Sequence, residues 1–188
     1  MNDIQKYTEM FLTLHTAKVK GQKAPHKAIL LLTIIDLVEK GIITSSHIEL
    51  SEELVDGFNE TWKRYLGLST IFTPDIAKPF FHMQHESFWR LVEYEEACSM
   101  MVAEESPWID QIKEKKPLLK GSYSLKAMRQ TFAYAEIDVN LFVLLKNAET
   151  RALFRTILIK EYLTTQPTKS MTNLTALMIT LSFITLVA

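Results

Sequence analysis

Residues 21–38, GQKAPHKAILLLTIIDLV, join a cluster of positive charge directly to a long aliphatic run. Pro25 suits the first turn of a helix, where its missing N–H breaks no hydrogen bond. Beyond it, apolar residues fall on nearly every side of the expected helix, which is typical of a helix surrounded by other elements. Gly41 is a good C-terminal cap. We therefore predict a central, buried helix that begins at Pro25 and ends at Gly41.

The segment before this helix is basic, because residues 15–27 hold four lysines and no acidic residue. His26 and Lys27 fall in the predicted first turn, where free backbone N–H groups and the helix dipole attract anions. Cations are disfavoured there unless an anion is present, so an external phosphate would relieve the conflict. The loop lysines of such a site are Lys18, Lys20 and Lys23. The alternative interpretation is a solvated loop with a structural proline.

Other helices are predicted on both sides of the central one from residues at helical spacing. They cover residues 4–14, 51–65, 125–132, 141–145 and 153–162, with a shorter helix between Pro107 and Pro117. Ser51 is an N-cap candidate, and an extended piece is expected around Ile48. Residues 71–92 are rich in aromatics and prolines, which predicts a loop leading into a strand or hairpin. The expected fold class is α+β, mainly helical, with a small β-hairpin or wing.

Composition limits the functional classes. The chain has 188 residues, of which 47% are hydrophobic, enough for one sizeable domain. Its formal charge of −1 gives no support from global basicity, so nucleic-acid binding would depend on local patches. A single cysteine, Cys98, rules out an intramolecular disulfide and a cysteine-rich zinc site. No secretory signal opens the chain, and we expect a cytoplasmic protein.

The end of the chain differs from the rest. We expect a domain over residues 1–163 and an apolar tail over 164–188, in which no charged residue follows Lys169. The run LTALMITLSFITLVA at 174–188 is shorter than the roughly 20 residues that a membrane-spanning helix needs. We favour a buried or aberrant tail over a membrane anchor.

Motifs of enzyme chemistry are weak. His82 and His85 stand three residues apart beside Glu86, but in the expected loop and strand they would point to opposite faces, so we predict no metal site. No glycine-rich phosphate loop, G-x-S-x-G elbow or Cys-His pair is found.

A second basic stretch lies in the second half of the chain. Its candidate residues for contacting a nucleic-acid backbone are Lys116, Lys120, Tyr123, Lys126 and Arg129. A solvated helix face is an equal interpretation of this stretch. The segment 86–105 is acidic, with six glutamates against Arg90.

Three stretches, APHKAILLL (24–32), KPFFHMQHESFWRL (78–91) and SYSLKAMRQTFAYAEID (122–138), resemble a known family. They are similar to the N-terminal DNA-recognition region of bacterial HNH-type restriction endonucleases, related to the sulfur-binding domains that read phosphorothioate DNA. The similarity spans roughly residues 1–163. It implies a mostly helical DNA-binding domain of a defence system, usually followed by an HNH nuclease that uses a metal ion to hydrolyse phosphodiesters.

The sequence departs from that family in two places. Nothing after Tyr162 offers a histidine or a cysteine, so we expect no catalytic residue and no cofactor in this chain. A divalent metal ion would belong to the missing nuclease domain, and a truncation or a shifted reading frame would explain the tail. Where sulfur-reading relatives have a Tyr-Pro-x-x-Ala type stretch, this chain has Lys78, Pro79 and His82. Only the proline is kept, so ordinary or differently modified DNA is at least as good a ligand as phosphorothioate DNA.

Taken together, these features predict a module that recognises plain or modified duplex DNA without cutting it. It would use the Lys18–Lys27 region, helped by Lys78, Pro79, His82 and Gln84 and by the second basic stretch. We expect no membrane association, and a homodimer is compatible with the sequence. The alternative is a protein-interaction or regulatory helical module that uses the acidic segment and the apolar tail. The DNA interpretation requires that the start of the aliphatic helix is not occupied by a carboxylate of the protein itself.

Overall fold

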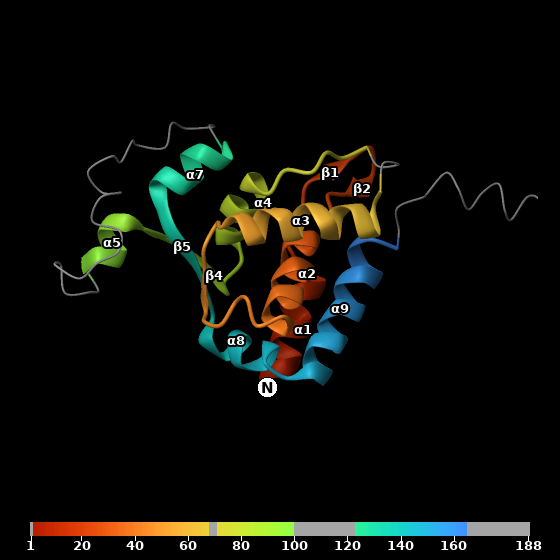
Figure 1. Cartoon of the computed structure of the whole chain (residues 1–188). Coiled ribbons are helices and arrows are strands. Elements are labelled where there is room, and N and C mark those ends of the chain that lie inside the picture. The colour runs from red at the N-terminus through yellow and green to blue at the C-terminus, as the bar shows by residue number, and fades with distance from the viewer. Residues whose placement is uncertain (1, 68–70, 100–122, 165–188) are drawn as a thin grey trace, which may run out of the picture.

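The computed structural model describes residues 2–67, 71–99 and 123–164. In these ranges helices predominate, and two small antiparallel sheets accompany them, as Figure 1 shows. The predicted fold class, α+β and mainly helical, is confirmed. The helix expected between Pro107 and Pro117, the tail from residue 165 onward, and Lys116 and Lys120 lie outside the described ranges. None of the described helices is long and apolar enough to cross a bilayer.

Helix α2 (His26–Glu39) lies at the centre of the helical body. It packs against α3 (Glu52–Tyr65), α4 (Ala77–His82) and α9 (Ala148–Tyr162). Every residue from 27 to 35 is buried, which confirms a helix surrounded by other elements. Pro25 is its N-cap, and the chain turns away at Gly41, whose φ of 70° favours glycine.

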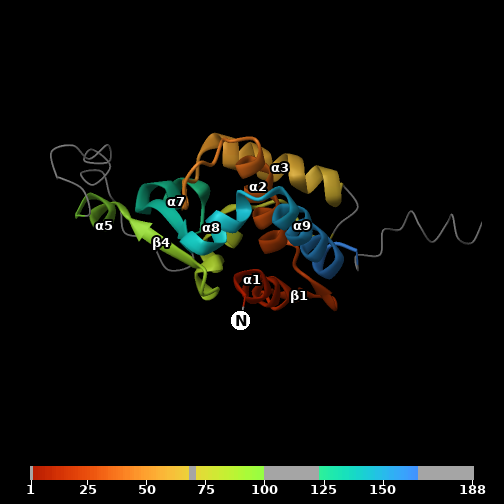
Figure 2. The same ribbon diagram turned by 90° about the horizontal axis from the view of Figure 1, so that it is seen from below.

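Helix α1 (Asp3–Leu12) packs against α9 and against α8 (Val139–Leu145), and Figure 2 shows it on the side of the helical body opposite α3. Its buried residues Tyr7 and Phe11 keep the helical spacing that the sequence predicts. The Phe11 ring meets Phe154 edge-on, with ring centroids 4.9 Å apart. The first helix and the last two described helices therefore share one core.

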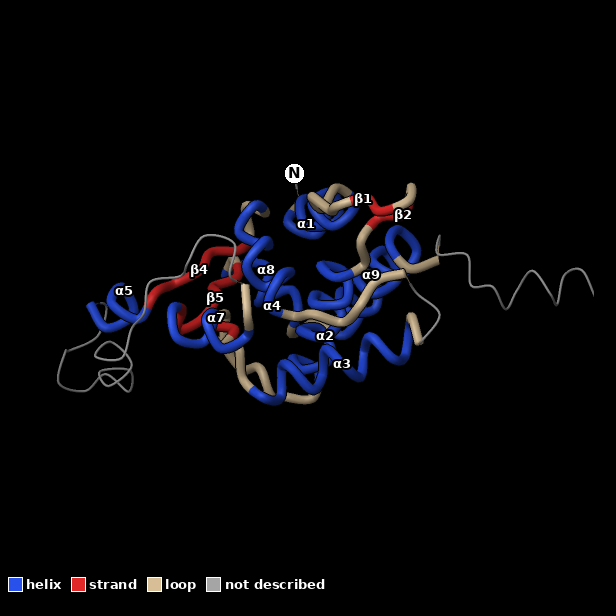
Figure 3. The backbone as a smooth tube through the Cα atoms, turned by 90° about the horizontal axis from the view of Figure 1, so that it is seen from above, coloured by secondary structure: helices blue, strands red, loops and turns tan. Residues whose placement is uncertain are grey.

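A three-stranded sheet borders the helical body. Its order is β3 (His47–Ile48), β5 (Phe132–Ile137) and β4 (Trp89–Glu93), with both pairings antiparallel. Helix α7 (Leu125–Thr131) leads into β5, and α5 (Tyr94–Ser99) follows β4. In Figure 3 this sheet lies at one end of the molecule and the hairpin of β1 (Lys18–Val19) and β2 (Gln22–Lys23) at the other.

The loop and strand or hairpin predicted over residues 71–92 are found in part, because strand β4 begins at Trp89, but the two-stranded hairpin lies elsewhere. Residues 77–85, expected as loop and strand, form α4 and the 3₁₀ turn η1 (Met83–His85). Phe80 and Met83, three residues apart, are buried, and Pro79 lies in the first helical turn, where it is tolerated. The hairpin is instead the lysine-rich loop, in which Lys20 and Gly21 both have positive φ, as a tight two-residue turn requires.

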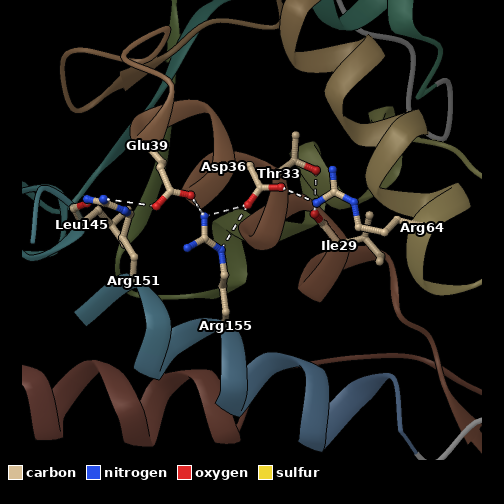
Figure 4. A network of polar contacts seen from close by, with 8 residues as sticks. All are labelled: Ile29, Thr33, Asp36, Glu39, Arg64, Leu145, Arg151 and Arg155. Carbon is tan, nitrogen blue, oxygen red and sulfur yellow. Dashed lines mark hydrogen bonds and ion pairs between the residues drawn. The ribbon is translucent and has the colours of Figure 1, made fainter. Parts of the chain in front are cut away.

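The far end of α2 is joined to α3 and α9 by a network of charges, shown in Figure 4. Arg64 of α3 donates to Asp36 Oδ2 at 2.8 Å, and Arg155 of α9 donates to Asp36 Oδ1 at 2.8 Å. Arg155 and Arg151 also reach Glu39. Since Asp36 is half-buried and bridges three helices, it anchors their relative positions.

Replacing Asp36 with asparagine should therefore lower the free energy of unfolding by about 2 kcal/mol, because two charge-assisted hydrogen bonds lose their anion. Urea denaturation followed by circular dichroism measures the change. The matched control is Asp56→Asn on the exposed side of α3, which should change stability by less than about 0.5 kcal/mol. Equal effects of the two variants would contradict a bridging role for Asp36.

Candidate functional site

A pocket of ≈ 430 Å³ lies where the start of α2 meets α4. Its lining includes residues of the two sequence stretches 24–32 and 78–91. The segment between α1 and β1 closes its third side. The lining residues are His15, Thr16, Ala17, Val19, Ala24, His26, Lys27, Phe72, Lys78, Pro79, His82 and His85. The structure thus brings together five of the predicted site residues, His26, Lys27, Lys78, Pro79 and His82.

Lys27 makes a buried ion pair inside the wall of this pocket. Its Nζ lies 2.5 Å from Glu86 Oε1, and the two side chains are only 7% and 6% exposed. Glu86 also accepts a hydrogen bond from the His15 backbone N–H at 2.9 Å, and its Oε2 lies 3.2 Å from His15 Nδ1. A buried charge is tolerated when it is paired and hydrogen-bonded in this way.

This pair corrects the expectation that Lys27 faces an external phosphate. The carboxylate of Glu86, 59 residues further along the chain, already neutralises the ammonium group. Pro25 at the N-cap makes no side-chain cap hydrogen bond, so the first turn of α2 lacks a cap from that residue. The protein resolves the predicted charge conflict at Lys27 with its own carboxylate.

His26 is held by its neighbours at the pocket. Its Nε2 lies 2.9 Å from the carbonyl oxygen of Thr73, which can only accept, so Nε2 carries the proton. The ring packs against Trp62, with centroids 4.8 Å apart, and edge-on against Phe72 at 5.8 Å. Burial lowers the pKa of His26 below its ordinary value, and this outweighs the raising effect of the Thr73 carbonyl. The ring is therefore mainly neutral near pH 7.

His82 belongs to an aromatic cluster at the pocket edge. Its ring is stacked on His85 with centroids 5.9 Å apart, and Tyr123 meets it edge-on at 5.1 Å. The expectation that the two histidines lie on opposite faces is wrong, because α4 and η1 are helical. Among the described residues, no group of three potential ligands could hold a metal ion. Burial, and then the electrostatic effect of the neighbouring His85, lowers the pKa of His82.

The lysines near the pocket differ in their partners. Lys18 and Lys20 are exposed on the hairpin, next to the pocket residue Val19. Lys78 is 63% exposed at the rim and lies 3.2 Å from Asp75. Lys23 contacts Glu161 at 2.5 Å and the ring of Tyr162. Within the described residues, Lys18 and Lys20 form no ion pair, and the ion pair of Lys78 with Asp75 is exposed to solvent. These three lysines are therefore available to an external partner.

The remaining predicted site residues lie apart from this pocket. Gln84 lines a separate cavity beside Trp89 and Phe132. Arg129 donates from Nε to the Leu50 carbonyl oxygen at 2.7 Å and from Nη1 to Glu52 at 2.7 Å. Arg129 therefore ties α7 to the start of α3, which corrects its expected role in following a nucleic-acid backbone. Lys126 is exposed on α7.

Sequence reasoning missed Glu86 and His15. Glu86 was grouped with the acidic segment 86–105 as a surface residue, although it is buried. Its position two residues before the apolar pair Phe88 and Trp89 is a weak signal of burial. His15 carried no signal, because its contact with Glu86 depends on how α1 and η1 are placed in space.

Comparison with models of known protein families and with curated proteins found no match to this sequence.

Lys27→Met should lower the free energy of unfolding by about 3–5 kcal/mol, because it leaves the Glu86 carboxylate buried without its cation. Guanidinium denaturation measures the loss. The control Lys23→Met breaks an ion pair of the same length that is about one third exposed, and should cost no more than about 1 kcal/mol. A small effect at Lys27 would contradict the structural role of the pair.

The lowered pKa of His26 predicts a pH-dependent stability. As the pH falls below the ordinary value of 6.5, the unfolded chain takes up a proton at His26 before the folded chain does. Stability from this group is therefore complete above pH 6.5 and decreases on acidification. His26→Phe, which keeps an aromatic ring, should lose less stability than the wild type between about pH 8 and about pH 5 in urea denaturation. Equal losses would contradict the assignment.

Proposed function

We propose that this chain binds duplex DNA through the face that surrounds the pocket at the start of α2. The observation that carries the proposal is the convergence of residues 24–32 and 78–91 on one pocket. These two stretches carry the resemblance to the DNA-recognition region of HNH-type restriction endonucleases. Residues 50 positions apart that line a common pocket are the arrangement expected of a shared ligand site.

The charge distribution supports phosphate contacts at the rim. Lys18 and Lys20 are exposed on the hairpin beside the lining residue Val19, and the lining residue Lys78 is 63% exposed. Phosphate contacts position a protein on DNA, and they need exposed cations on the protein surface. Glu86 neutralises Lys27, so the condition that no carboxylate of the protein occupies the start of α2 is not met, and the helix start itself no longer supports DNA binding. The electrostatic case for DNA therefore rests on the rim lysines.

The aromatic and histidine side chains could provide selectivity. His26, His82 and Tyr123 present ring faces and nitrogen or hydroxyl groups near the pocket. Such groups contact bases by stacking and by hydrogen bonds to their edges. We propose the role of a recognition module that acts on cytoplasmic DNA, and we expect no cleavage by this chain alone. Phosphorothioate DNA is one candidate ligand beside plain and otherwise modified duplexes.

The alternative, a protein-interaction module, depends on the acidic segment and the tail. In its described part, Glu86 is buried and Glu96 pairs with Arg90. Residues 100–105 and 165–188 lie outside the described ranges. Of the two candidates, only DNA binding predicts a strong dependence of affinity on salt concentration.

The proposal predicts that Lys18→Ala combined with Lys20→Ala weakens DNA binding and lowers the slope of log affinity against log salt by about two, at about 0.9 per lost phosphate contact. Fluorescence anisotropy with plain and phosphorothioate duplexes over a range of salt concentrations measures both quantities. Including both duplexes also tests whether sulfur is recognised.

The control variant is Lys40→Ala combined with Lys146→Ala, which removes the same charge from exposed positions away from the pocket. Lys40 follows the far end of α2, about 20 Å from the pocket along a helix of 14 residues. This variant should keep the wild-type slope. Absence of salt-dependent binding to either duplex, or equal losses in the two variants, would refute the proposed function.

A further inference from the structure

Glu86 has a role in the pocket that goes beyond stability. It is not one of the pocket-lining residues, whereas Lys27 and His15, which both contact it, are. The Glu86 carboxylate therefore lies behind the pocket lining, in contact with the lining residues Lys27 and His15. Any anion that entered the pocket would meet an ammonium group already paired at 2.5 Å and a negative charge immediately behind it.

The other polar groups of the lining do not restore a net positive charge. Lys78 lies 3.2 Å from Asp75, and its side chain extends into solvent at the rim. His26 donates to the Thr73 carbonyl oxygen, and burial keeps its pKa and that of His82 below the ordinary value. The apolar part of the wall consists of Ala17, Val19, Ala24, Phe72 and Pro79. The buried part of the lining around Lys27, Glu86 and His26 is thus close to neutral, while Lys78 lines the pocket only at its exposed rim.

We infer that Glu86 determines the specificity of the pocket by neutralising Lys27, so that the pocket accepts an uncharged part of a nucleic acid, a base or a substituent on a base, and rejects phosphate. This inference rests on the proposed use of the pocket as a ligand site. It assigns phosphate contacts to the exposed lysines Lys18, Lys20 and Lys78, and recognition of the base to the interior of the pocket. A nucleobase is a suitable class of ligand because it is flat and uncharged, and the lining combines the apolar side chains of Val19 and Pro79 with the ring of His82.

The substitution Glu86→Gln tests the inference with inorganic phosphate as the probe. Glutamine keeps the shape of the side chain and an oxygen that can accept from Lys27, but it removes the negative charge. Lys27 then has an uncompensated charge facing the pocket. We expect Glu86→Gln to bind phosphate at least about tenfold more tightly than the wild type in isothermal titration calorimetry at low salt.

Glu161→Gln is the matched control, because it removes the same charge from an ion pair of the same length at Lys23, which does not line the pocket. It should bind phosphate as weakly as the wild type does. Equal phosphate affinity in the two variants would overturn the inference. Since no DNA is present, this result is independent of the success or failure of the proposed function.

If Glu86→Gln does not fold, a measurement on the wild-type chain tests whether Glu86 prevents phosphate from binding Lys27. In an NMR titration with inorganic phosphate, the signals of the Lys27 side chain and the His15 backbone amide should stay unchanged, because Glu86 keeps both partners. Movement of these two signals on addition of phosphate would overturn the inference, since it would mean that phosphate competes with Glu86 for Lys27.

Discussion

The burial of α2 on all sides is the constraint on which the rest of the structure depends. A helix whose residues 27–35 are all buried must be enclosed, and α3, α4 and α9 enclose it. Polar side chains of such a helix have to find partners within the protein, because water does not reach them. The two charged residues of α2 that are buried or half-buried, Lys27 at the start and Asp36 near the end, both do so.

These two partnerships have different consequences. Asp36 accepts hydrogen bonds from Arg64 and Arg155 on two other helices, so it holds the helical body together. Lys27 and Glu86 lie beside a pocket, so their pairing also determines what charge that pocket presents. One physical requirement, the pairing of buried charge, therefore acts on packing at one end of α2 and on the charge of the pocket wall at the other.

The local patterns were sufficient for most helices. Tyr7 and Phe11 in α1, the Ser51 cap of α3, and Gly41 after α2 follow rules that operate over a few residues, so sequence alone predicts them. Residues 77–85 did not follow such a rule, because prolines and aromatics suit a loop as well as a helix packed on α2. Their helical state comes from the burial of Phe80 and Met83, which is a tertiary effect.

The sequence by itself determined a mainly helical α+β fold, a central aliphatic helix and a cluster of cations at its start. Only the tertiary structure decided what those cations do, since an ion pair between residues 59 positions apart leaves no periodic trace in the chain. It left Lys18 and Lys20 in solvent and paired Lys27 with Glu86. The physical reason is that charge is a local property of a residue, whereas the burial and pairing of that charge are set by the elements that pack around it.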